Sequence, residues 1–115
     1  MESLPLRACA TLAGDPVVTR DGEELGVLEH VMLDVRAGRI AYAVVARGGV
    51  FGIGERLYAV PWSMLRRDAA LDCFVADVAP ERLDAAPSFD REHWPAMDAD
   101  WLARIHDHFD VPSHA

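Results

Sequence analysis

Turn signals divide the first half of the chain into short segments, a pattern typical of short strands. Asp21-Gly22 and Ala37-Gly38 are such signals, and a glycine-rich stretch runs from Gly48 to Gly54. Asp-Gly is a strong hairpin signal because both positions tolerate positive φ. The segments between these turns are rich in the β-branched and aromatic residues that favour strands. The first half of the chain therefore predicts a mainly β structure.

The segment from Val27 to Val35 alternates in the way of a half-buried strand. We expect its odd-numbered residues on the core face: Val27, Glu29, Val31, Leu33 and Val35. Glu29 is the exception on that face, because a buried carboxylate needs a partner. The arginines nearest in sequence are Arg36, Arg39 and Arg47, and one of them is the expected partner in a structural ion pair.

The next segment, Arg39 to Arg47, is apolar on both faces. Such a strand is either buried on both sides or exposed at an interface. The glycine-rich loop that follows carries Val50, Phe51 and Ile53, which form our candidate interaction surface. These side chains either fold back onto the domain or meet a partner. The strand and the loop together predict a homodimer.

The C-terminal part, residues 79–115, differs from the first half in its pattern of residues. Asp98 is placed to cap a helix, and apolar residues follow it at helical spacing: Trp101, Leu102, Ile105 and Phe109. An isolated helix of this length is marginal in water. We therefore expect the tail to pack on a barrel, its own or a neighbour's, with Trp94 and Trp101 as anchors. The alternative is a free arm that folds only on a partner.

Charge is distributed unevenly along the chain. Residues 1–67 contain eight arginines and eight acidic residues, whereas residues 68–115 contain three arginines and eleven acidic residues, so the later part carries the whole net charge of −8. An acidic surface repels a phosphate backbone, so nucleic acid is not an expected partner. It either serves only solubility or suits a basic protein partner.

The sequence contains few motifs that indicate catalysis, nucleotide binding or metal binding. Lysine is absent, and the glycine loop matches neither GxGxxG nor GK[ST]. The histidines are His30, His93, His106, His108 and His114, which we expect to be solvated, His30 being half-buried. Cys9 and Cys73 match no zinc spacing and are expected to be reduced thiols. We predict no catalytic, cofactor or metal site.

No segment is apolar over the ~20 residues that a membrane helix needs. The N-terminus has no basic start followed by a long apolar core, so no signal peptide is expected. These patterns predict a cytoplasmic protein without membrane insertion.

Five sequence segments, taken together in their order and spacing, resemble a known family. They are Asp21–Val27, Val31–Asp34, Gly38–Val44, Gly48–Gly54 and Tyr58–Trp62. Together they resemble the PRC-barrel family. The resemblance covers residues 12–78, after an N-terminal segment of residues 1–11. Ala86–Asp90 and Trp94-Pro95 also look like the extension of stand-alone bacterial members.

The resemblance implies a small, strongly bent antiparallel β-barrel, here with a short C-terminal helical extension. Members include the cytoplasmic part of the photosynthetic reaction-centre H subunit and the C-terminal domain of a ribosome-maturation factor, which use the barrel for contact with a larger assembly. The expected function is therefore a non-enzymatic protein-binding or assembly module whose partner the sequence does not identify. One alternative is an RNA- or ribosome-associated maturation factor. The other is a barrel that binds a small ligand or a metal.

Overall fold

The computed structural model of the protein describes residues 13–48 and 54–111. A seven-stranded sheet with the strand order β5-β6-β1-β2-β3-β4-β7 forms its body, which confirms a mainly β fold. The strands are β1 (Pro16–Val18), β2 (Glu24–Asp34), β3 (Arg39–Arg47), β4 (Arg56–Pro61), β5 (Leu65–Asp68), β6 (Cys73–Ala76) and β7 (Ser88–Phe89). Neighbouring strands are antiparallel except β1 and β6, which are parallel. The sheet is therefore mixed.

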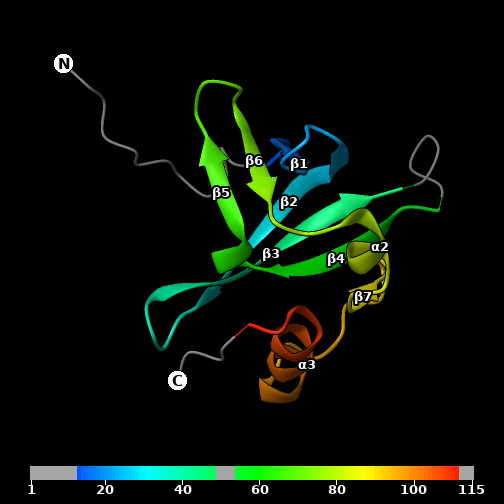
Figure 1. Cartoon of the computed structure of the whole chain (residues 1–115). Coiled ribbons are helices and arrows are strands. Elements are labelled where there is room, and N and C mark those ends of the chain that lie inside the picture. The colour runs from blue at the N-terminus through cyan, green and yellow to red at the C-terminus, as the bar shows by residue number, and fades with distance from the viewer. Residues whose placement is uncertain (1–12, 49–53, 112–115) are drawn as a thin grey trace.

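The long strands β2 and β3 bend sharply, so the sheet wraps around its own core (Figure 1). Two register shifts between β2 and β3 produce part of this bend: Glu29 is the extra residue in β2 at the first, and Ala41 is the extra residue in β3 at the second. At Gly26 the backbone of β2 lies very close to β3. A Cβ at this position would collide with the carbonyl oxygen of Ala46 and lie 2.9 Å from Val45 Cγ1. The sheet has β5 and β7 at its edges, and no pairing between these two edges occurs in the described residues.

The face of β2 that packs into the core differs from the expected one. Leu25 and Leu28 are buried, whereas Val27, Leu33 and Val35 are exposed. The strict alternation over residues 27–35 was therefore the wrong pattern. Val27 and Leu28 precede the bulge at Glu29, so the phase is already inverted at the start of the segment. The extra residue Glu29 then interrupts the alternation a second time.

From Tyr42 to Ala46, strand β3 is buried on both faces. Ala43, Val44 and Val45 are completely shielded from solvent, and they belong to one core cluster with residues of β4, β6 and α3. Of the two explanations for a strand that is apolar on both sides, burial on both sides is the correct one. This strand pairs with β2 and β4 and leaves no edge for another chain.

Short helices complete the fold. The 3-10 helix η1 (Trp62–Met64) follows β4, α2 (Pro80–Asp84) begins at a proline, and α3 (Ala99–Phe109) closes the chain. Asp98 caps α3, because its Oδ1 accepts a hydrogen bond of 3.0 Å from the backbone N–H of Trp101. The described helices include none that is long and apolar enough to span a bilayer.

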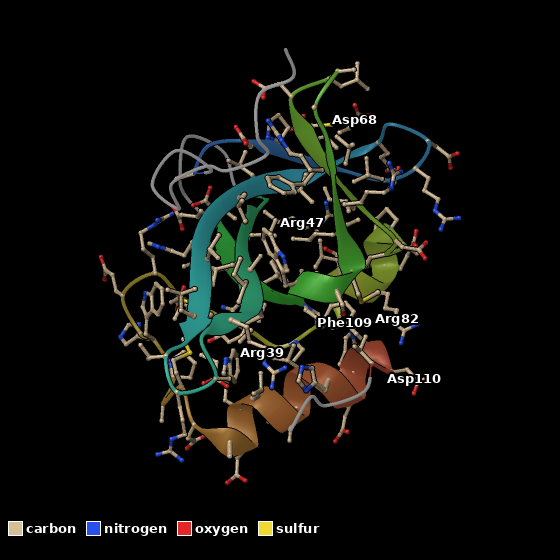
Figure 2. All side chains as sticks on the ribbon, turned by 90° about the vertical axis from the view of Figure 1, so that its left-hand side faces the viewer. Arg39, Arg47, Asp68, Arg82, Phe109 and Asp110 are labelled. Atoms are coloured by element: carbon tan, nitrogen blue, oxygen red, sulfur yellow. The ribbon has the colours of Figure 1, made fainter. Side chains whose placement is uncertain are left out.

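The far end of α3 is tied to α2. A guanidinium nitrogen of Arg82 donates to the carbonyl oxygen of His108 at 2.9 Å, and His108 Nε2 lies 2.8 Å from the carbonyl oxygen of Arg82. Figure 2 shows Arg82 beside Phe109 and Asp110 at this end of the helix. The reciprocal contact satisfies a terminal helix carbonyl and fixes α3 against the body.

Candidate interaction surface

An open groove lies between the hairpin formed by β2 and β3 and the first turn of α3. We call residues 31–42, the distal part of this hairpin, the hairpin arm. The groove has a volume of about 510 Å³, and it is lined by Met32, Leu33, Asp34, Val35, Arg36, Ala41, Tyr42, Met97, Asp98, Ala99, Trp101 and Leu102. Two segments that lie far apart in sequence therefore form its two walls.

Several large apolar side chains of these walls remain in contact with water. Val35 is 89% exposed, Leu33 is 56% exposed and Met97 is 38% exposed. All three are among the most exposed large apolar residues that the structure describes. Single exposed apolar residues need no explanation, but these three line one concavity.

The local backbone explains why Leu33 and Val35 face solvent. The register shift between Met32 and Leu33, where Ala41 of β3 is the extra residue, interrupts the pairing of the two strands just before Leu33. The carboxylate of Asp34 then accepts a hydrogen bond of 2.9 Å from the backbone N–H of Ala37, and Gly38 takes a φ of 70° to close the turn. The arm thus projects beyond the sheet (Figure 1), and its side chains Leu33 and Val35 are exposed.

A hydrogen-bond chain forms the floor of the groove. Trp101 Nε1 donates to the Tyr42 hydroxyl at 3.1 Å, and that hydroxyl donates to Met97 Sδ at 2.7 Å. Burial raises the pKa of the Tyr42 hydroxyl above its ordinary value, and the hydrogen bond from Trp101 offsets part of this rise. The chain joins the hairpin arm to α3 and holds Met97 at the rim.

The two tail tryptophans occupy different environments. Trp101 is 4% exposed and its ring lies 5.9 Å from that of Phe89, edge to face. Trp94 is 40% exposed and lies over Phe89 and His30, with ring centroids 4.9 and 5.2 Å away. Trp101 is therefore enclosed between the tail and the sheet, whereas Trp94 covers the outside of β2.

The apolar loop residues Val50, Phe51 and Ile53 lie outside the described residues. The groove residues Leu33, Val35 and Met97 did not emerge as surface candidates from the sequence. Strict alternation places Leu33 and Val35 on the core face. The amino-acid pattern gives no clear signal of the register shifts between β2 and β3, or of the end of β2 at Asp34.

A second concavity, of about 460 Å³, is lined by Gly54, Glu55, Arg56, Asp90, Arg91, Glu92 and His93. Beside it Arg91 bridges Glu29 and Glu55 with one guanidinium nitrogen to each carboxylate. These hydrogen bonds, the one to Glu29 foremost, raise the pKa of Arg91 above its ordinary value. The expected partner of Glu29 among Arg36, Arg39 and Arg47 was wrong, because the tail brings Arg91 to it from 62 positions away.

The histidines do not gather into a site. His93 and His108 are each hydrogen-bonded or paired within the tail, and His30, which was expected to be half-buried, is exposed and lies edge-on to Trp94. His106 was expected to be solvated but is only 9% exposed, because it faces the body from the buried side of α3. His114 lies outside the described residues. Among the residues that the structure describes, no three His, Cys, Asp or Glu side chains are placed to hold a metal ion.

Comparison with known proteins identifies a family for this chain. A family model described as the PRC-barrel domain matches residues 6–83. The match includes all of β1 to β6 and most of α2, and it stops before β7 and α3. No curated protein matches the chain.

Proposed function

The chain belongs to the PRC-barrel domain family, and from this premise we propose that it is a non-enzymatic protein-binding or assembly module. The surface that we assign to this role is the groove between the hairpin arm and α3. We place the module in the cytoplasm as part of the same proposal. Its partner is a protein surface and not a substrate or a nucleic acid.

The observation that carries the proposal is the uncovered apolar lining of the groove. Leu33, Val35 and Met97 remain exposed along one groove, although most other large apolar side chains of the described residues are buried or partly buried. Covering such side chains is worth about 25 cal/mol per Å² of apolar area, so a partner that covers this patch gains several kcal/mol before the costs of association. Catalysis would instead require converging polar groups, whereas the Asp34 and Asp98 carboxylates in this groove accept local backbone hydrogen bonds.

Site-specific photo-crosslinking in the native host tests the proposal. A photoreactive phenylalanine analogue replaces Val35 in the groove, and in a matched control it replaces Leu71, which is 72% exposed on the distant hairpin between β5 and β6. We expect position 35 to form a crosslinked species with a protein and position 71 to form none. If neither position crosslinks, or both do so equally, the groove is not a protein-binding surface.

A further inference from the structure

We propose that the occupant of the groove is the hairpin arm of a second copy of this chain. The two copies form a two-fold dimer in which each arm enters the groove of the other. This inference rests on the proposed function and names its partner. It differs from the dimer expected from the sequence, which used strand β3 and the loop after it. In the structure β3 is paired with β2 on one edge and with β4 on the other.

The first argument is the self-complementary shape of the surface. A two-fold interface uses the same patch on both subunits, so the patch must contain both the inserted element and the surface that receives it. Here the arm supplies the projecting Leu33 and Val35, and the first turn of α3 with its preceding residues supplies the receiving wall of Met97 and Leu102. Each exposed apolar side chain of one copy therefore finds an apolar wall on the other.

The second argument is charge. Arg36 lies at the tip of the arm, and Asp98 lies on the opposite wall. Within the part of the chain that the structure describes, Arg36 forms no ion pair, and the Asp98 carboxylate is bonded only to the backbone of its own helix. In the two-fold arrangement the arm of one copy brings Arg36 toward Asp98 of the other, twice per dimer. A neutral apolar segment from a different protein would offer neither Arg36 nor Asp98 an oppositely charged partner.

The third argument is area. A stable interface buries about 800 Å² on each partner, of which somewhat more than half is apolar. Leu33, Val35 and Met97 supply exposed apolar surface on both walls, and the partly exposed Met32, Ala41 and Leu102 of the same groove add to it. In a two-fold dimer both walls of both copies take part, so the surface buried on each copy extends beyond the three most exposed side chains.

Sedimentation equilibrium of the purified full chain at micromolar to submillimolar concentration is the first test. We expect a reversible dimer for the wild type and a monomer for Val35→Asp, which places a charge in the interface without touching the core. Leu71→Asp is the matched control and should remain dimeric. A monomeric wild type, or a dimer that persists in Val35→Asp, overturns the proposal.

Charge reversal tests the geometry, with circular dichroism of each variant checking that the fold is kept. Arg36→Asp and Asp98→Arg each place like charges across the interface, so each variant alone should dimerise at least roughly tenfold more weakly. An equimolar mixture should recover a heterodimer, because the introduced carboxylate of one variant then meets the introduced guanidinium of the other, while the second contact keeps the original Arg36 and Asp98. Asp98→Asn, which keeps a capping side chain, should weaken the dimer without loss of helix. A mixture that associates no better than its components rejects the Arg36–Asp98 arrangement.

The crosslinking experiment separates failure of this inference from failure of the proposed function. A crosslink from position 35 to a second copy supports both. A crosslink to a different protein, with a monomeric wild type in solution, rejects the second copy as occupant and leaves the protein-binding function in place. Absence of any crosslink specific to position 35 rejects the function itself.

Discussion

Tyr42 joins the hairpin arm to the tail through a single oxygen atom. Its hydroxyl accepts a hydrogen bond from the Trp101 indole and donates one to Met97, so two residues of the tail depend on one residue of β3. The side chain is 4% exposed. Buried polar groups are costly to leave unpaired, which makes this contact a sensitive point of the fold.

Replacement of Tyr42 by phenylalanine removes that oxygen and leaves the buried indole N–H of Trp101 without its partner. We expect the free energy of unfolding to fall by about 1–3 kcal/mol. Urea denaturation followed by fluorescence measures the change. Tyr58→Phe is the control and should cost much less, because Tyr58 is also buried in the sheet but its hydroxyl has no such hydrogen bond to the described part of the tail. Equal costs for the two variants would contradict this role of the Tyr42 hydroxyl.

The same hydroxyl makes the stability of the fold depend on pH in the alkaline range. Burial raises the pKa of Tyr42 above its ordinary value of 10.0, so the folded state holds the proton more tightly than the unfolded chain does. The contribution is fully present below pH ~10 and is lost as the pH rises through the folded pKa, because unfolding then releases a proton. We expect the stability difference between wild type and Tyr42→Phe to shrink between about pH 9 and about pH 11 in denaturation experiments. A difference that stays constant over this range would refute the assignment.

At the scale of elements, α3 is held at both ends and along one face. Asp98 caps its first turn, Arg82 contacts its last turn, and Trp101, Ile105 and Phe109 are buried at helical spacing between these ends. An 11-residue helix has little stability of its own, so its order comes from this docking. The helix in turn provides one wall of the groove.

Replacement of Trp101 by alanine should detach this helix more effectively than any change on its outer face. We expect a loss of roughly 3–5 kcal/mol in unfolding free energy, because the side chain is almost fully enclosed. Hydrogen exchange over residues 98–109 should accelerate in the variant. Trp94→Ala, at a site that is 40% exposed, is the comparison and should cost less than half as much. Rapid exchange of α3 in the wild type would show that the docked helix is not the state in solution.

At the scale of the whole molecule, arginines of the first half join acidic residues of the second. Arg47 pairs with Asp84 at 2.7 Å, and Arg20 pairs with Asp77 at 3.3 Å, although both contacts are largely or partly open to water. Such pairs add little stability individually. They do place these positive charges beside carboxylates, so a phosphate backbone would have to compete with the protein's own acidic groups for them.

This charge distribution, with a net charge of −8, predicts weak interaction with RNA. We expect no affinity tighter than the micromolar range typical of non-specific binding, since the acidic surface opposes the approach of phosphates. Fluorescence anisotropy with ribosomal RNA fragments at physiological salt measures it, and an unrelated RNA of equal length is the control. Tight binding that discriminates between the two RNAs would favour the maturation-factor alternative.

Sequence patterns alone determined the β-rich class, the turns near Asp21-Gly22 and Ala37-Gly38, the capped helix after Asp98 and the family of the chain. Each of these depends on residues close together in sequence or on an ordered set of short strings, so local patterns suffice. The tertiary structure decided the phase of β2, the partner of Glu29 and the existence of the groove. A bulge adds one residue without a distinct amino-acid signal. Arg91 reaches Glu29 across 62 positions, and the two walls of the groove come from segments that meet only when α3 docks on the sheet.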